Sequence, residues 1–336
     1  GVGRLMDPAT GSLAPEIALM STTPEWLSLV VGLFGGLALF LFGMEQMTVA
    51  LKAVAGDRMR SLLGRLTVNR FAGMATGAFV TAVIQSSSVT TVLVVSFISS
   101  GLMTLTQALG VILGANIGTT ITAQIVAFKV TKLAMFMIAA GFGLGFLAKG
   151  ETIRNHGNGI LGLGLVFLGM TVMGDAMAPL RHHEPFLEWM VRMEHPALGV
   201  LAAAGFTALV QSSSATTAVV IAMASQGLIS LQTGIALILG ANVGTCVTAL
   251  LAAIGKPREA IRAAIAHVIF NLLGVGLWIG FVAELATGVT LISPQSIQLS
   301  GAARLAADTP RQIANAHTLF NVANALVFAP FVPVLA

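Results

Sequence analysis

An internal repeat, in which polar residues recur at one fixed distance inside apolar sequence, constrains the fold of this chain more than any other feature. Residues 85–88 read Gln-Ser-Ser-Ser and so do residues 211–214, while 114–119 (Gly-Ala-Asn-Ile-Gly-Thr) recur as 240–245 (Gly-Ala-Asn-Val-Gly-Thr). Both pairs differ by 126 positions, and no gap is needed from about residue 35 to residue 129. Chance similarity between apolar sequences would not keep polar residues in register over that length. The chain is therefore predicted to contain two copies of one structural unit.

The composition places both copies in a membrane. Of the 336 residues, 56% are hydrophobic and 9% are charged, whereas soluble domains carry about 25% charged residues. Apolar runs that approach the roughly 20 residues needed to cross a bilayer are predicted to span it. These runs cover residues 27–50, 105–127, 132–148, 158–178, 231–254, 261–283 and 312–332. The net charge of +4 comes without a basic tract interleaved with aromatic residues, so no nucleic-acid partner is expected.

Two further apolar stretches, 71–100 and 197–228, are each interrupted near the middle by the Gln-Ser-Ser-Ser motif. The piece on either side of each motif is about 12–15 residues long, which is too short to cross a bilayer comfortably. Four consecutive polar residues at membrane depth are tolerated only where they are buried in protein or line a water-filled cavity. Both stretches are therefore predicted to be re-entrant helical hairpins with the motif at the tip.

Each copy then contains one span, one hairpin and two more spans, which is an odd number of crossings. The second copy is therefore predicted to be inverted, as in many secondary transporters. The expected fold class is an all-α polytopic membrane protein with two inverted-topology repeats, each with a re-entrant hairpin. The alternative is a duplicated scaffold without a transport role. The expected organisation is a polar N-terminal segment at 1–26, repeat 1 at 27–150, repeat 2 at 151–283, and an extracellular loop with a final span at 284–336.

Positively charged residues predict the orientation, because cytoplasmic loops of membrane proteins are enriched in Lys and Arg. If each hairpin returns to its own side, the loops around 51–70, 149–154 and 256–262 share one side and hold 10 of the 17 Lys and Arg residues. That side is predicted to be the cytoplasm, with the chain in a bacterial cytoplasmic (inner) membrane, its N-terminus outside and its C-terminus inside. Lys129 and Lys132 are exceptions that fall on the outer side.

The Gln-Ser-Ser-Ser tips carry the groups of an anion site. Ser is a preferred N-cap, and the second arm of each hairpin is expected to begin at the motif. Unpaired backbone N–H groups and the positive end of the helix dipole would face the tip, beside the Ser hydroxyls and the Gln amide. Because a hydroxyl also accepts hydrogen bonds, the same tip could coordinate a small cation. The alternative is that these residues only cap a hairpin.

Two other polar patterns recur. Glycines in the Gly-Ala-Asn-x-Gly-Thr motifs could let a helix unwind and present carbonyls to Na⁺, with Asn and Thr adding oxygens; the alternative is close helix packing through small residues. An Ala-His-x-x-Phe-Asn pattern occurs twice and places His and Asn on one helix face. Its histidines, His267 and His317, are interpreted as structural support. Its asparagines, Asn271 and Asn321, fit either support or the lining of a path.

The two motif-bearing regions carry no charge. No charged residue lies between Phe71 and Phe128, or between Pro196 and Gly255. An anion bound there would meet no Arg or Lys from these segments, and an unpaired buried anion is strongly disfavoured. Bound cations are the simplest source of the missing charge, so the sequence predicts that anion and cation bind together, each poorly without the other. Glu45, the one acid well inside a predicted span, is interpreted as an interfacial residue.

Paired Gln-Ser-Ser-Ser motifs in inverted repeats, each followed by Gly-Ala-Asn-x-Gly-Thr, resemble the type II family of sodium-dependent phosphate cotransporters, including its bacterial members. The Ala-Asn-Ala-His-Thr-Leu-Phe-Asn run at 314–321 strengthens the resemblance, which covers about residues 27–332. It implies a symporter of Na⁺ and inorganic phosphate with no cofactor other than the transported Na⁺. Cys246 stands where the first copy has Thr120, so the second copy has a thiol in place of that hydroxyl.

The residue patterns and the resemblance together predict three sets of site residues. The expected phosphate ligands are Gln85, Ser86, Ser87, Ser88, Gln211, Ser212, Ser213 and Ser214. The expected Na⁺ ligands are Gln85, Ser88, Asn116, Thr119, Gln211, Ser214, Asn242, Thr245 and Thr248. Residues that would line a path or support the site are Thr90, Thr216, His267, Asn271, His317 and Asn321.

Many bacterial members of that family carry a cytoplasmic helical domain resembling phosphate-uptake regulators after the last span, where this sequence stops. The resemblance therefore implies either that this domain is absent or that a regulator-like domain or protein meets the C-terminus. Alternative functions are transport of another oxyanion or an organic anion, coupling to H⁺ in place of Na⁺, a passive phosphate channel or exporter, and a phosphate-binding sensor subunit. No paired carboxylates, nucleophile–base set or metal-ligand cluster stands out in the sequence, so an enzyme is not expected.

Overall fold

The computed structural model describes residues 25–55, 69–128 and 131–335, and every regular element in these ranges is helical. Residues 1–24 of the predicted polar segment at 1–26 and most of the basic loop at 51–70 lie outside the described residues. The α-helices are α2 (Glu25–Ala55), α4 (Arg70–Ile84), α5 (Ser87–Ser99), α6 (Leu105–Val126), α7 (Ala134–Leu147), α8 (Glu151–Met177), α9 (Glu184–Arg192), α10 (Pro196–Val210), α11 (Ser213–Ser225), α12 (Leu231–Ala253), α13 (Arg258–Trp278), α14 (Val282–Ile292), α15 (Gly301–Phe328) and α16 (Val332–Leu335). The 3-10 helices are η2 (Thr131–Leu133), η3 (Ala178–His182), η4 (Ile279–Phe281) and η5 (Ala329–Phe331).

Within the described ranges, 5 helical segments are long and apolar enough to cross a membrane: Trp26–Val54, Leu105–Val126, Glu151–His182, Leu231–Ala253 and Arg258–Ile292. The pair α9 and α10, bent by 107°, would be a sixth. The other apolar helices, among them α4, α5 and α11, are shorter, as the interruption by the motifs predicted.

Three predicted segments differ from the structure. The span predicted at 132–148 is α7, which has 14 residues and at 1.5 Å per residue is only about 21 Å long. The final span predicted at 312–332 is the second half of α15, a 28-residue helix that begins earlier and carries Arg304, Asp308 and Arg311 in its first half. The loop expected from residue 284 begins instead with α14, because the apolar run continues to Ile292.

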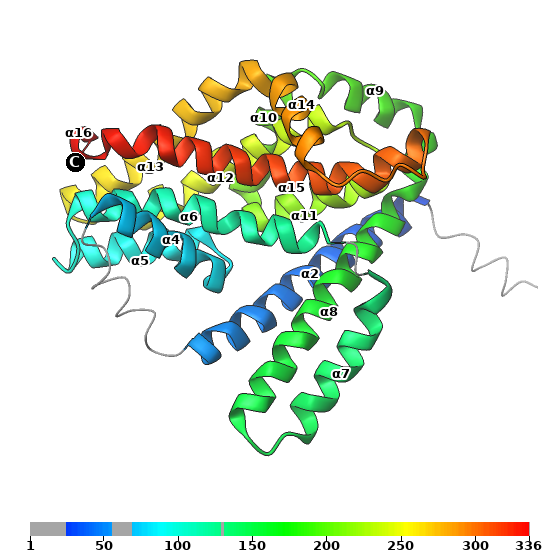
Figure 1. The fold of residues 1–336 in the computed structure, drawn as a ribbon, viewed down its shortest axis with the longest axis horizontal. Coiled ribbons are helices and arrows are strands. Elements are labelled where there is room, and N and C mark those ends of the chain that lie inside the picture. Colours follow the sequence, from blue (N-terminus) through cyan, green and yellow to red (C-terminus); the bar gives the residue numbers. More distant parts are fainter. Residues whose placement is uncertain (1–24, 56–68, 129–130, 336) are drawn as a thin grey trace, which may run out of the picture.

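Helices α2, α7 and α8 form one bundle, which Figure 1 shows at an angle to the remaining helices. Small residues bring α2 and α8 into backbone contact. A Cβ on Gly43 would lie 2.6 Å from the Gly162 carbonyl oxygen, and one on Gly36 would lie 2.8 Å from that of Gly169. Glycine at these positions therefore sets how closely the two long helices pack.

The second bundle contains both helix pairs that flank the Gln-Ser-Ser-Ser motifs. Helix α4 packs on α6 and α10 packs on α12 through the glycines of the Gly-Ala-Asn-x-Gly-Thr motifs. A Cβ on Gly114 would lie 2.8 Å from the Met74 Cα, and one on Gly240 would lie 2.9 Å from the Val200 Cα. The expectation that these glycines unwind a helix was wrong, since α6 and α12 run unbroken through the motif. Close packing against α4 and α10 accounts for them instead.

Helices α13 and α15 complete this bundle in matching ways. Helix α13 packs on α12, α6 and α5, and α15 packs on α6, α12 and α11. Asn116 of α6 donates to the Asn271 Oδ1 of α13 (3.2 Å), and Asn242 of α12 donates to the Asn321 Oδ1 of α15 (3.3 Å). In its packing, α13 therefore corresponds to α15. In sequence, the repeat offset of 126 instead relates α13 to α7, which packs on α8.

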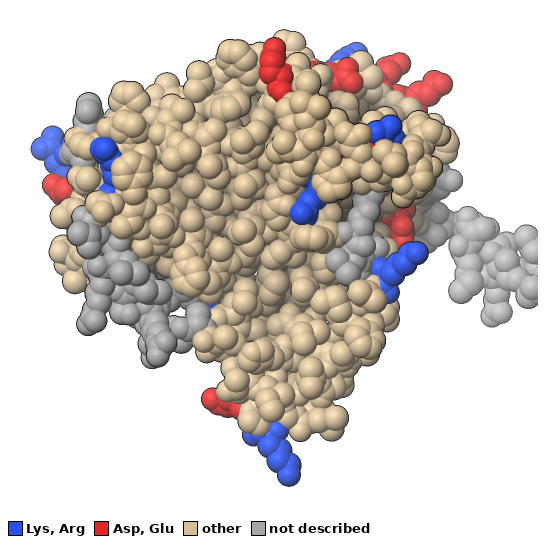
Figure 2. Space-filling view, viewed as in Figure 1, with Lys and Arg blue, Asp and Glu red and all other residues tan. Residues whose placement is uncertain are grey.

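Charged side chains are sparse on the face drawn in Figure 2 and gather mostly near its edges, leaving a broad uncharged area between them. Large apolar side chains are exposed instead, such as Phe136, Phe142 and Phe146 on α7. A surface of this kind is suited to lipid.

Candidate functional site

Each Gln-Ser-Ser-Ser motif forms a sharp break between two helices. Gln85 ends α4 and Gln211 ends α10, both in the left-handed region with φ 58°, the only non-glycine residues with positive φ among those described. The next residue caps the following helix: the Ser86 hydroxyl accepts from the Val89 N–H and the Ser212 hydroxyl from the Ala215 N–H, each at 3.2 Å. The predicted capping role of the motif is therefore confirmed in both copies.

The Gln side chains hold each break in place. The Gln85 amide donates to the Ala82 carbonyl, and its Oε1 accepts from the Thr122 hydroxyl of α6 at 2.8 Å. The Gln211 amide donates to the Ala208 carbonyl at 2.6 Å, and its Oε1 accepts from Thr248 of α12 at 2.8 Å. In this conformation both amides are engaged with the protein, so they position the tip rather than present free ligands.

A threonine pair ties the two arms of each break together. Thr81 donates to the Thr90 hydroxyl at 2.8 Å, and the hydroxyls of Thr207 and Thr216 lie 2.6 Å apart. All four residues are buried. Thr90 and Thr216, predicted as path or support residues, therefore act as support in this structure.

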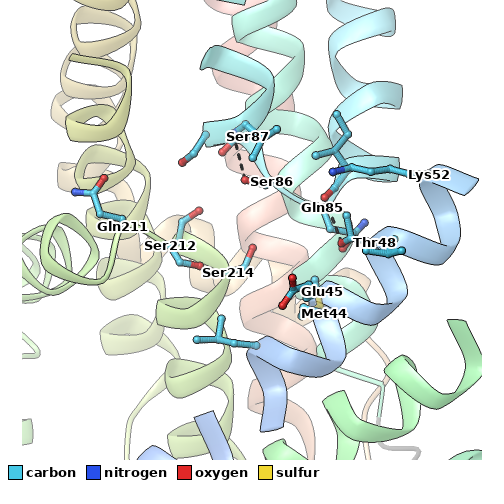
Figure 3. A pocket seen from close by; sticks show the side chains of 16 residues that line it. Met44, Glu45, Thr48, Lys52, Gln85, Ser86, Ser87, Gln211, Ser212 and Ser214 are labelled. Carbon is cyan, nitrogen blue, oxygen red and sulfur yellow. Dashed lines mark hydrogen bonds between the residues drawn. The ribbon is translucent and has the colours of Figure 1, made fainter. Parts of the chain in front are cut away.

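One pocket of about 290 Å³ brings both motifs together with one face of α2. Its lining includes residues 84–89, residues 211–214 and, from α2, Leu41, Met44, Glu45, Thr48, Val49 and Lys52. Figure 3 shows the two motifs on opposite sides of this space, with α2 closing a third side. The predicted phosphate ligands, 126 residues apart in sequence, thus line a single site.

Free donors in the pocket come from the first turns of α5 and α11. The first backbone N–H groups of a helix have no intrahelical partner and lie at the positive end of its dipole. Ser87, Ser88, Ser213 and Ser214 add hydroxyls, and none of these hydroxyls is hydrogen-bonded within the described chain. Two converging helix N-termini with free hydroxyls are well suited to bind an oxyanion.

The structure does not place the predicted Asn and Thr ligands of Na⁺ in this lining. Thr119 and Thr245 donate to carbonyls one turn back on their own helices, at 3.1 and 2.9 Å. Asn116 and Asn242 join α6 to α13 and α12 to α15, as described above. Their partners Asn271 and Asn321 donate in turn to the carbonyls of His267 and His317, each at 2.9 Å. This buried ladder connects helices.

Sequence reasoning missed the contribution of α2. Glu45, Thr48 and Lys52 recur at three- and four-residue spacing on one helix face, and all three line the pocket. Thr48 also donates to the Ile84 carbonyl at the end of α4 (3.3 Å). The spacing is visible in the sequence, but nothing in it says that this face meets the motifs. Glu45, interpreted as an interfacial residue, is therefore also a pocket residue.

Replacing Thr122 by Val should destabilise the protein more than the matched change Thr248→Val. Gln85 is 5% exposed, so losing its donor leaves a buried amide oxygen unpaired, a cost of about 1–2 kcal/mol. Gln211 is exposed and water can replace Thr248. Thermal unfolding in detergent, followed by size-exclusion fluorescence, measures both variants. An equal or larger loss in Thr248→Val would contradict this account of the two tips.

The fold and the pocket together define a class: a polytopic helical membrane protein with a polar pocket between two broken helix pairs. Residues 39–175 and 182–293 match the sequence profile of the Na⁺/Pi-cotransporter family. This match covers more than half of the chain, so the protein belongs to that family. The resemblance predicted from the motifs is therefore confirmed. No solved structure matches the chain.

Several known proteins are similar to this chain. Uncharacterized protein YqeW of Bacillus subtilis is 29% identical over 292 residues, which are 87% of this chain and 91% of the relative. The putative inorganic phosphate export protein YjbB of Escherichia coli K12 is 28% identical over 306 residues, 90% of this chain and 54% of the relative. Sodium-dependent phosphate transport protein 2C of Homo sapiens is 47% identical over 85 residues, 24% of this chain and 14% of the relative. The chain thus spans about half the length of the export protein.

Proposed function

We propose that the protein is a secondary transporter that couples Na⁺ to the movement of inorganic phosphate by alternating access around the pocket between the two motifs. The observation that carries this proposal is the single pocket lined by both Gln-Ser-Ser-Ser motifs. Membership of the Na⁺/Pi-cotransporter family supports the choice of phosphate and Na⁺. The human relative's name, sodium-dependent phosphate transport protein 2C, agrees with this choice.

Phosphate would bind between the first turns of α5 and α11. The backbone N–H groups and hydroxyls of Ser87, Ser88, Ser213 and Ser214 would donate to its oxygens. Lys52 is the one cationic side chain in the pocket lining among the described residues. Ser86 and Ser212, with Gln85 and Gln211, would keep the two tips in the conformation that presents these donors.

The transport mechanism requires a topology that lets the tips meet at mid-membrane. Helices α4 and α5 have 15 and 13 residues, or about 22 and 20 Å, against a hydrocarbon core of about 30 Å. Lengths of this kind support re-entrant hairpins, and the sequence repeat supports two inverted halves. We infer a bacterial cytoplasmic membrane with the N-terminus outside and the C-terminus in the cytoplasm, where a regulator-like domain or protein would meet it.

Na⁺ would bind at the tips beside the anion, using Ser88 and Ser214 hydroxyls. Gln85 and Gln211 would contribute their amide oxygens only if Thr122 and Thr248 released them. Asn116, Thr119, Asn242 and Thr245 would join only after a rearrangement of α6 and α12, because in this structure they bond to neighbouring helices or to their own. Rocking of the α2–α7–α8 bundle against the other helices would expose the pocket to either side in turn.

Export is the competing direction of transport. The relatives from Escherichia coli and Salmonella typhimurium carry the name putative inorganic phosphate export protein. The same pocket would serve a passive or outward route, because donors that bind phosphate do not determine the direction of net flux. Uptake and export are distinguished by whether a Na⁺ gradient drives phosphate across the membrane, and in which direction.

Phosphate uptake into proteoliposomes tests the proposal. We expect radiolabelled phosphate to accumulate above its external concentration when Na⁺ is higher outside, and not when K⁺ replaces Na⁺. Reversing the Na⁺ gradient in preloaded vesicles should drive phosphate out. Movement that only equilibrates phosphate, with or without Na⁺, would contradict coupling and favour a passive exporter. Accumulation of another oxyanion in place of phosphate would contradict the substrate.

A further inference from the structure

The phosphate pocket contains a carboxylate as well as its anion-accepting groups. Glu45 of α2 lines the same pocket as both motifs, and Figure 3 shows it on the side of α2 that faces Ser212 and Ser214. Lys52 lies on the same helix face two turns away, about 10 Å along the axis. Glu45 forms no ion pair with any residue that the structure describes.

Among the residues that the structure describes, no cationic side chain on the helices packed against α2 neutralises the charge of Glu45. Helix α11 carries no charged residue, and α4 carries only Arg70 at its first position. Helix α8, which packs along α2, has none between His156 and Asp175. Two like unit charges about 6 Å apart repel enough near a protein surface to weaken binding about 100-fold. Lys52 is a cation of the same pocket but forms no ion pair with Glu45, so a cation bound beside this carboxylate would favour anion binding.

We propose that Glu45 is an anionic Na⁺ ligand of the pocket, and that the ion it holds makes phosphate binding dependent on Na⁺. This inference rests on the proposed function and adds a charged ligand to a cation site otherwise made of neutral oxygens. With Na⁺ absent, the carboxylate repels phosphate. When Na⁺ is bound between Glu45 and the hydroxyls of the second motif, the ion neutralises the carboxylate and attracts phosphate. Oxygen ligands of this kind suit a hard monovalent cation.

Binding measurements on the purified protein test this role without transport. Inorganic phosphate is titrated calorimetrically at one pH, in NaCl and in choline chloride of equal ionic strength. In the wild type, choline should weaken phosphate binding strongly. In Glu45→Gln, phosphate affinity in choline should rise about 100-fold over the wild type, so that most of the Na⁺ dependence is lost. Glu45→Asp, which keeps the charge, should retain the dependence.

Two further variants separate charge from structure. Glu188→Gln removes an exposed carboxylate on α9 and should behave as the wild type in both salts. Lys52→Gln removes the opposite charge from the pocket and should lower phosphate affinity in both salts. If Glu45→Gln keeps the wild-type ratio of affinities in NaCl and choline, or shifts affinity in the same direction as Lys52→Gln, the inference is overturned. Failure of the wild type to bind phosphate in NaCl would instead overturn the proposed function.

Discussion

Replacing Ser87 and Ser213 together by Ala is expected to lower phosphate affinity roughly 100- to 10,000-fold. Both hydroxyls line the pocket at the start of α5 and α11, and a hydrogen bond to a charged ligand contributes about 1.5–3 kcal/mol. If the two motifs bind one phosphate ion, each single variant should lower phosphate affinity by about the square root of the factor for the double variant. Calorimetric titration of phosphate in NaCl measures all three.

The matched control lies at the other end of the same helices. Ser99 and Ser225 are also 126 residues apart, and their hydroxyls donate to carbonyls of their own helices, those of Val95 and Ala222. The double variant Ser99→Ala, Ser225→Ala should bind phosphate as the wild type does. If only one of Ser87→Ala and Ser213→Ala weakens binding, phosphate contacts one motif alone, and a site shared by both motifs would be rejected.

Leucine at Gly114 or Gly240 is expected to disrupt the pairs α4–α6 and α10–α12. Even a Cβ at these positions would overlap the backbone of Met74 or Val200, and overpacking of a rigid contact costs about 1–3 kcal/mol or more. The helices must separate, which moves Gln85 or Gln211 away from its threonine partner. We expect a thermal midpoint lowered by several degrees and loss of phosphate binding.

The control for this prediction is Gly205→Leu in α10, where a Cβ would meet nothing within 4 Å. That variant keeps the helix pair intact and should retain both stability and phosphate affinity. Size-exclusion profiles and thermal unfolding in detergent compare the three proteins. Normal stability in Gly240→Leu would mean that α10 and α12 do not need close contact, and the packing explanation of the motif would fail.

The two Gln-Ser-Ser-Ser tips show which structural features a local sequence pattern can predict. Polar residues placed between short apolar stretches predicted a break at residues 85–88 and 211–214, and the structure has helix ends at both, with Ser86 and Ser212 as caps. The capping preference of Ser is a local property, so the sequence was sufficient. The Gln side chains were predicted as ligands, but they pair with Thr122 and Thr248, 37 residues further along the chain.

The glycines of the Gly-Ala-Asn-x-Gly-Thr motifs illustrate the opposite case. A glycine can either loosen a helix or admit a neighbouring backbone, and these alternatives look identical in one sequence. In the structure, α4 packs on α6 and α10 packs on α12, so these glycines serve close helix packing. In the same way, the asparagines predicted as Na⁺ ligands bond to α13 and α15, whose positions no local pattern specifies.

The sequence by itself determined the membrane class, the repeat, the two breaks and the family, because composition, repeated motifs and capping residues are visible along the chain without knowing which helices meet. Only the tertiary structure decided that one face of α2 covers both motifs and adds Glu45 and Lys52 to the pocket. It also decided that α15 rather than α7 corresponds to α13. The physical reason is that apolar helix faces are nearly interchangeable in sequence, whereas which faces meet depends on how closely their backbones can pack over the whole bundle.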